Sequence, residues 1–180
     1  TSVMEVVLEV IDADPMSEQS DLLTLNLTDL VRYFIEVGDF TSLITVYDRL
    51  NRHREESEAF SIPIAEHTLD LYNEQEFVDT VLDGFNVWEE SKHEEIRQLI
   101  LHACDPFIEP LIDRLADAES MSMRQFLMAI LYEMGEPAKQ AAIRRLQDKR
   151  WYLVRNLVIL LRRYDDPEVM QPLRFLIGHK

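Results

Sequence analysis

The stretch VRNLVILLRRYDDPEV, residues 154–169, contains the features that decide the fold. Its apolar run, LVILL, follows one arginine and precedes two others, and a pair of aspartates then leads into a proline. A run that is apolar on every side indicates a helix buried on more than one face. Arginines are favourable at a helix C-terminus, and Asp166 before Pro167 is typical of the start of another helix. The stretch therefore predicts a buried helix, a tight turn and a second helix.

The composition is that of a folded helical protein. Of the 180 residues, 47% are hydrophobic and 29% are charged, which is sufficient for a real core, and only 4 are glycine. The single cysteine, Cys104, cannot form an internal disulfide, which favours a reducing, cytoplasmic location. The N-terminus shows no signal peptide, and no run approaches the roughly 18 apolar residues of a membrane span. We therefore expect no membrane partner.

The net charge of −16 is unevenly distributed along the chain. Residues 1–138 hold 30 acidic and 8 basic side chains, whereas residues 139–180 hold 4 acidic and 10 basic ones. A strongly acidic body repels a phosphate backbone, so no nucleic-acid partner is expected. The asymmetry favours a protein partner or end-to-end assembly, and a chance skew of a solvated surface is the alternative.

Apolar residues recur at helical spacing almost throughout, and capping residues separate the helices. Gly38 predicts a helix C-cap and Asp39 the N-cap that follows it, while Ser122 with Gln125 predicts a capping box. The segment 3–11 fits a helix or a strand, and we favour a helix. Ten further helices are predicted, over residues 24–37, 39–55, 58–72, 74–90, 92–103, 105–117, 121–134, 136–148, 151–164 and 166–178.

The C-terminal half repeats itself with a period of about 30 residues. Arg124 and Arg155 are 31 positions apart, and Pro137 and Pro167 are 30 positions apart. A unit of this length holds two helices, and a single helix hairpin cannot bury its apolar face alone. The sequence therefore predicts an all-α fold, an α-solenoid of about five stacked antiparallel helix pairs.

The same stretches resemble a known family. LADAESMSMR and LQDKRWYLVR both contain Leu-x-Asp followed by an apolar–Arg pair, with Asp117 seven residues before Arg124 and Asp148 seven before Arg155. Together with a proline-led second helix, this pattern is similar to the short HEAT-like repeat named after phycobilisome lyases. The resemblance implies a ladder of ion pairs between neighbouring repeats. In this chain Asp117 would meet Arg124 or Arg155, and Asp148 would meet Arg155.

The resemblance divides the chain into three parts of one continuous domain. It is strongest over residues 92–180, and residues 91–180 would form HEAT-like repeats. Residues 24–90 lack the Asp and Arg signature and would form diverged helical hairpins, and residues 1–23 would form an N-terminal segment or cap. The chain lacks an initiator methionine and ends in IGHK, where a further repeat would begin, which suggests a part of a longer protein. We expect a bacterial source.

Residues that could support chemistry are scattered along the sequence. His102 and Cys104 are two positions apart on a helix and so do not share a face. His93–Glu94 is a single His-Glu pair, whereas the HEAT-like deoxyhypusine hydroxylases stack several such pairs around iron. We expect no catalytic, metal or cofactor site.

The predicted function is binding. Arg144 and Arg174 lie seven residues after the leading prolines of their helices, so stacking should align them along one face, with Arg145 beside them, as a protein-binding patch. Trp88 and Trp151 are interpreted as packing residues at helix ends. The leading hypothesis is a non-catalytic scaffold for a protein partner or another domain of the same chain. An enzyme or a bilin-lyase-type ligand handler on the same stack is the alternative.

Overall fold

The computed structural model describes residues 3–13, 20–56 and 62–178. All regular elements in these ranges are helices, which confirms the all-α prediction for them. The segment 3–11, for which a strand was the alternative, is helical, and the predicted start of a helix at residue 58 lies outside the described ranges. The chain forms two compact units, unit 1 (Thr1–Ala103) and unit 2 (Cys104–Lys180).

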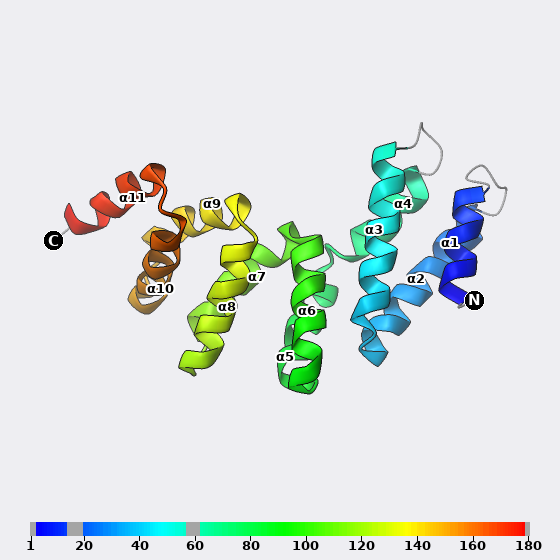
Figure 1. Ribbon diagram of the computed structural model, residues 1–180, viewed down its shortest axis with the longest axis horizontal. Coiled ribbons are helices and arrows are strands. Elements are labelled where there is room, and N and C mark those ends of the chain that lie inside the picture. Colours follow the sequence, from blue (N-terminus) through cyan, green and yellow to red (C-terminus); the bar gives the residue numbers. More distant parts are fainter. Residues whose placement is uncertain (1–2, 14–19, 57–61, 179–180) are drawn as a thin grey trace. The chain divides into compact units, whose positions relative to one another are not determined.

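Unit 1 is built around α3, which packs against α2, α4 and α6, while α2 also contacts α1, α4 and α5. Tyr72 is the largest fully buried side chain of this core. Its hydroxyl donates a hydrogen bond of 2.8 Å to the carbonyl of Leu43 in α3. Figure 1 shows the helices of unit 1, which are α1 (Val3–Ala13), α2 (Ser20–Val37), α3 (Phe40–Glu56), α4 (Ile62–Leu71), α5 (Gln75–Val87) and α6 (Glu90–Ala103).

The turn between α2 and α3 is closed by a tryptophan from the end of α5. Gly38 has φ +68°, a left-handed conformation that suits glycine, and Asp39 accepts a hydrogen bond of 3.1 Å from the N–H of Ser42. These contacts confirm the predicted C-cap and N-cap. The indole of Trp88 lies over Gly38 and meets Phe40 edge to face at 6.3 Å between ring centres. The interpretation of Trp88 as a packing residue is therefore confirmed.

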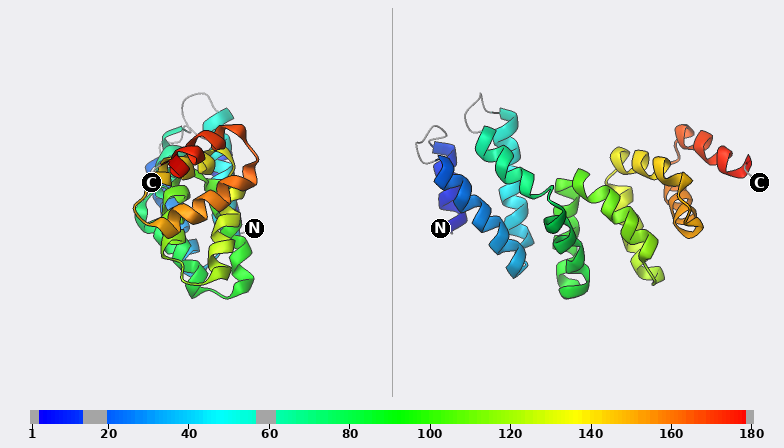
Figure 2. Two further views of the ribbon diagram at one scale, coloured as in Figure 1. Left: turned by 90° about the vertical axis from the view of Figure 1, so that its left-hand side faces the viewer. Right: turned by 180° about the vertical axis from the view of Figure 1, so that it is seen from behind.

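In unit 2, α7 and α8 each pack against the next helix in the sequence and also against the helix after that. α7 contacts α8 and α9, and α10 contacts α7, α8 and α9. Figure 2 shows this arrangement from a second side. The predicted boundaries agree to within a few residues, with short 3-10 turns, η1 and η2, ending two of the predicted helices. The elements are α7 (Asp105–Asp117), α8 (Met121–Glu133), α9 (Glu136–Arg144), η1 (Arg145–Gln147), α10 (Trp151–Leu161), η2 (Arg162–Tyr164) and α11 (Pro167–Gly178).

Helix ends in unit 2 are held by side chains. Ser120 is the N-cap of α8 and accepts from the N–H of Met123 at 3.0 Å, so the capping box predicted at Ser122 was placed two residues too late. The Tyr164 hydroxyl donates to the Leu131 carbonyl near the C-terminus of α8 at 3.1 Å, and burial raises the pKa of Tyr164 to about 12.

The link from α10 to α11 is held by a buried charge. Asp165 has φ +48° and turns the chain, and Asp166 accepts a hydrogen bond of 2.9 Å from the N–H of Glu168. Lys139 of α9 is almost completely buried and pairs its ammonium group with Asp166 and, at 2.7 Å, with Glu136. The prediction that DDP turns the chain and caps a second helix is confirmed.

Candidate protein-binding surface

Two of the three arginines of the predicted patch already pair with acids of the same unit. The patch consists of Arg144, Arg145 and Arg174. Arg145 is only 24% exposed, and its guanidinium pairs with Glu109 at 2.8 Å and with Asp113 at 2.6 Å, both from α7. Arg144 is 65% exposed and lies 3.6 Å from Glu109. Arg174 is exposed on α11 and takes no part in these ion pairs. The arginines at the end of α9 and directly after it therefore pair with acids of α7, a contact that their spacing alone did not indicate.

A third arginine, Arg150, which the sequence reasoning missed, completes this network. Arg150 contacts Asp148 through a side-chain hydrogen bond of 2.9 Å and a backbone N–H hydrogen bond of 2.9 Å, and it contacts Asp113 at 3.2 Å. Asp148 also lies 3.3 Å from Arg145. The predicted pairing of Asp148 with Arg155 is therefore wrong. In the turn, the carboxylate folds back onto the N–H two residues ahead, which brings it to Arg150 and away from the second turn of α10.

The other predicted pair of the ladder is also not formed. Arg124 donates two hydrogen bonds of 2.8 Å, to the backbone carbonyls of Ala118 and Glu119. These carbonyls follow the last turn of α7, where helix carbonyl groups lack partners within the helix. No ion pair joins Asp117 to Arg124 or Arg155, all of which lie in the part of the chain that the structure describes. Arg124 is a helix-capping residue rather than one half of an ion pair.

The network lowers the pKa of its acids. The hydrogen bonds from the side chain and the N–H of Arg150 hold the pKa of Asp148 well below its usual range. Burial acts to raise the pKa of Asp113, but the hydrogen bonds from Arg145 and Arg150 outweigh it, so this pKa is lowered as well. Both acids are therefore charged in the folded protein over the whole neutral range.

These shifts predict an acid-dependent loss of stability. A carboxyl whose folded pKa is depressed stabilises the fold above its unfolded pKa, about 4, and this contribution is lost as the pH falls through the folded pKa. We expect the unfolding temperature to fall between about pH 5 and pH 2, and Asp148→Asn to be less stable at pH 7 and to lose less on acidification. Thermal unfolding followed by circular dichroism measures both effects. Asp70→Asn, at an exposed site of unit 1, is the control, and equal slopes for parent and Asp148→Asn would contradict the prediction.

The exposed face of α10 carries arginines and apolar side chains together. Tyr152 and Ile159 are 42% and 38% exposed, and Arg155, Arg162 and Arg163 are exposed with them. Positions three, four and seven apart share one side of a helix, so these five residues form one surface, the α10 face. The three arginines form no ion pair with any residue that the structure describes. Residues 151–164 contain no acid, and the α10 face is therefore cationic without internal compensation.

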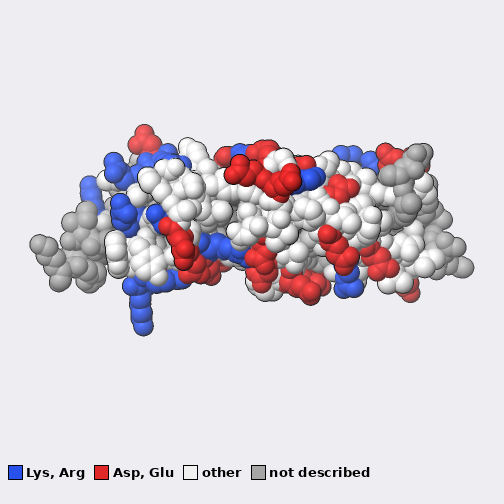
Figure 3. Space-filling view, turned by 90° about the horizontal axis from the view of Figure 1, so that it is seen from below, with Lys and Arg blue, Asp and Glu red and all other residues white. Residues whose placement is uncertain are grey.

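An exposed tryptophan extends the apolar part of this surface. Trp151 is 71% exposed and meets Tyr152 edge to face at 6.2 Å between ring centres. Its interpretation as a packing residue is wrong, because at the start of α10 it points away from the core formed by Leu153 and Leu157. Figure 3 shows Lys and Arg side chains (blue) gathered beside a white surface of uncharged residues, over the part of unit 2 that carries α10. Large exposed aromatic side chains beside arginines are typical of protein-binding surfaces.

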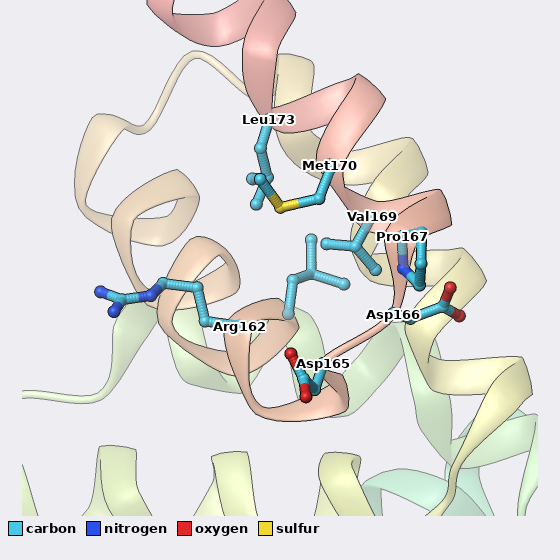
Figure 4. A pocket seen from close by; sticks show the side chains of 8 residues that line it. Arg162, Asp165, Asp166, Pro167, Val169, Met170 and Leu173 are labelled. Carbon is cyan, nitrogen blue, oxygen red and sulfur yellow. The ribbon is translucent and has the colours of Figure 1, made fainter.

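A cleft between the end of α10 and α11 adjoins the α10 face. Its volume is about 420 Å³, and Figure 4 shows Val169, Met170 and Leu173 pointing into it, with the guanidinium of Arg162 extending away at its rim. Arg162 belongs to both the cleft and the α10 face. A partner on the α10 face could thus place an apolar side chain in the cleft.

The chain matches no family model, no curated protein and no solved structure. Among the described residues, no helix is both long and apolar enough to cross a bilayer. The same residues contain no group of three or more His, Cys, Asp or Glu side chains placed to hold a metal ion.

Proposed function

We propose that this protein is a non-catalytic, helical-repeat binding module, and that the α10 face docks an acidic segment of a protein partner. The observation that carries the proposal is the group of three exposed arginines, Arg155, Arg162 and Arg163, which lie beside apolar side chains and form no ion pair with any residue that the structure describes. Charged surfaces of this kind accelerate encounter with an oppositely charged partner, and the aromatic and aliphatic groups beside them supply the affinity.

The proposed architecture is a stack of HEAT-like hairpins. In unit 2, contacts between α7 and α9 and between α8 and α10 are those expected where each hairpin lies on the one before it. Gly38 and Gly135, at matching places in the two units, have nearly the same positive φ, +68° and +71°. The proposed location is the cytoplasm, because the single cysteine suits a reducing compartment.

A binding titration with a defined acidic probe tests the proposal. The probe is a fluorescein-labelled peptide in which Glu and Leu follow helical spacing, and its fluorescence anisotropy is measured against increasing protein. We expect Arg155→Glu/Arg162→Glu to weaken binding by about tenfold or more, because it replaces two ion pairs, each worth up to about 1 kcal/mol, by repulsions. Raising the salt from about 0.05 M to about 0.5 M should also weaken binding to the parent.

Two control variants show whether binding depends on the α10 face itself. Arg52→Glu/Arg54→Glu changes the net charge equally on α3 of unit 1 and should bind the probe almost as the parent does. Arg144→Glu/Arg174→Glu tests the patch that the sequence predicted. If this last variant loses binding and the α10 variant does not, the interface is the predicted patch. If the parent gives no saturable binding at low salt, the proposed function is wrong.

A further inference from the structure

Unit 1 contains a groove whose chemistry is the opposite of the α10 face. It has a volume of about 440 Å³ and lies between α2 and the start of α5. Its floor is apolar, formed by Val31, Ile35, Leu71 and Phe77. The floor residues come from α2, α4 and α5, which pack together in the core of unit 1, so the groove lies wholly within this unit.

The rim of the groove is acidic. Glu36, Glu74 and Glu76 are exposed on it, and Arg32 is the one basic side chain among its lining residues. No ion pair joins Arg32 to these three acids, all of which the structure describes. Unit 1 as a whole has 23 acidic and 6 basic residues, whereas unit 2 has 11 and 12. The groove therefore presents an apolar floor inside a negative rim.

The α10 face has the two properties that such a groove would recognise. Tyr152 and Ile159 offer apolar side chains to the floor, and Arg155 and Arg162 offer cations to the rim. An amphipathic helix seated in a groove with anchors at helical spacing is a common mode of recognition. Opposite charges on the two surfaces also set the orientation and reject contacts between like surfaces.

We infer that the groove of unit 1 binds the α10 face of a second copy of this chain, so that the protein associates head to tail. Because the two surfaces differ, the contact is heterologous, and each added copy leaves one free groove and one free α10 face. This inference rests on the proposed function, since it names the acidic partner of the α10 face. Because the groove is lined by few residues, we expect weak, reversible association, favoured by low salt.

Sedimentation velocity of the full chain measures this association directly. The parent should sediment near its monomer mass of 21.2 kDa when dilute, and its average mass should rise as the concentration is raised over roughly 10–500 µM. Added salt, or an excess of the acidic peptide, should return it to the monomer. A mass that stays constant over this range would overturn the inference. The mass would also stay constant if the groove bound the α10 face of its own chain only, and that result would overturn the inference too.

Complementary variants identify the two surfaces. Arg155→Glu/Arg162→Glu destroys the α10 face and keeps the groove. Glu36→Arg/Glu74→Arg destroys the groove and keeps the α10 face. A cation at residue 36 is favourable, because it lies at the C-terminal end of α2, whereas a cation at residue 74, the N-cap of α5, is mildly unfavourable through the helix dipole, and no side-chain cap is lost there. Each variant alone should remain a monomer, and circular dichroism verifies that both are folded.

Mixing the two variants gives the decisive result. One chain keeps the acidic groove and the other keeps the cationic α10 face, and their altered surfaces carry the exchanged charges, so an equimolar mixture should associate although neither variant does so alone. A single chain with all four substitutions should associate again, since its charges are exchanged. Glu66→Arg/Asp70→Arg, on exposed positions of α4, is the charge-matched control and should behave as the parent.

The outcomes distinguish this inference from the proposed function. If the parent binds the acidic peptide through the α10 face but stays a monomer, the partner is another protein, and only the head-to-tail inference fails. If the mixture of variants stays monomeric while the parent associates, the parent uses other surfaces, and the inference fails as well.

Discussion

Replacing Tyr72 by alanine should lower the free energy of unfolding of unit 1 by about 3–5 kcal/mol, the usual loss when a large buried aromatic side chain is removed. Tyr72 is fully buried, and its ring lies 5.1 Å from that of Tyr47 and 4.7 Å from that of Phe77, measured between ring centres. The cavity would open where α4 ends against α3. A urea titration followed by circular dichroism measures the change.

Tyr72→Phe separates the contribution of the ring to stability from that of the hydroxyl group. This variant keeps the packing and loses only the hydrogen bond to the Leu43 carbonyl, so we expect a loss of about 1 kcal/mol. Burial raises the pKa of Tyr72 above its ordinary value, as expected for a hydroxyl that must remain neutral in the core. A Tyr72→Ala loss as small as that of Tyr72→Phe would show that the ring does not support the core.

Replacing Gly38 by alanine should cost unit 1 about 2–5 kcal/mol. A side chain at a positive φ costs about 1–2 kcal/mol, and overpacking costs about 1–3 kcal/mol more. The added methyl group would lie 2.7 Å from the ring of Trp88, closer than packed atoms can approach, and the ring is held against Phe40. Urea titration again gives the free energy of unfolding.

Gly135→Ala is a matched control for the Gly38 substitution. Gly135 has almost the same φ, +71°, but no heavy atom lies within 4 Å of its added methyl group. Gly135 has ψ −134°, so its cost should be limited to the strain of a sparsely populated backbone conformation, about 1–3 kcal/mol. In the double variant with Trp88→Leu, Gly38→Ala should cost less than it does alone, because the smaller side chain relieves the clash. Equal costs at Gly38 and Gly135 would refute the steric argument.

Much of the local structure could be predicted because it depends on neighbouring residues. Asp39 and Asp166 cap helices through backbone N–H groups two or three residues away, so a few letters of sequence are enough to place them. Gly38 meets a requirement for positive φ that few other residues satisfy. Capping by serine was harder to place, because Ser120 and Ser122 are both suitable and only the backbone path selects Ser120.

The ion pairs and the exposed surface could not be predicted in this way. An arginine side chain reaches any acid within several ångströms, so its partner depends on which helices become neighbours. Repeat spacing assigned Asp148 to Arg155, whereas the turn before α10 brings it to Arg150. Likewise, spacing placed Arg145 in a free patch, but the packing of α9 on α7 brings Glu109 and Asp113 to it.

The sequence by itself determined that the described chain is helical and, to within a few residues, where its helices begin and end, because apolar periodicity and caps act over one or two turns. Only the tertiary structure decided which charges remain free. Arg155 and Trp151 stay exposed because α10 turns its apolar side, with Leu153 and Leu157, toward its neighbours and leaves the opposite side uncovered. That choice depends on contacts between helices that are distant in sequence, and it determines the surface available for binding.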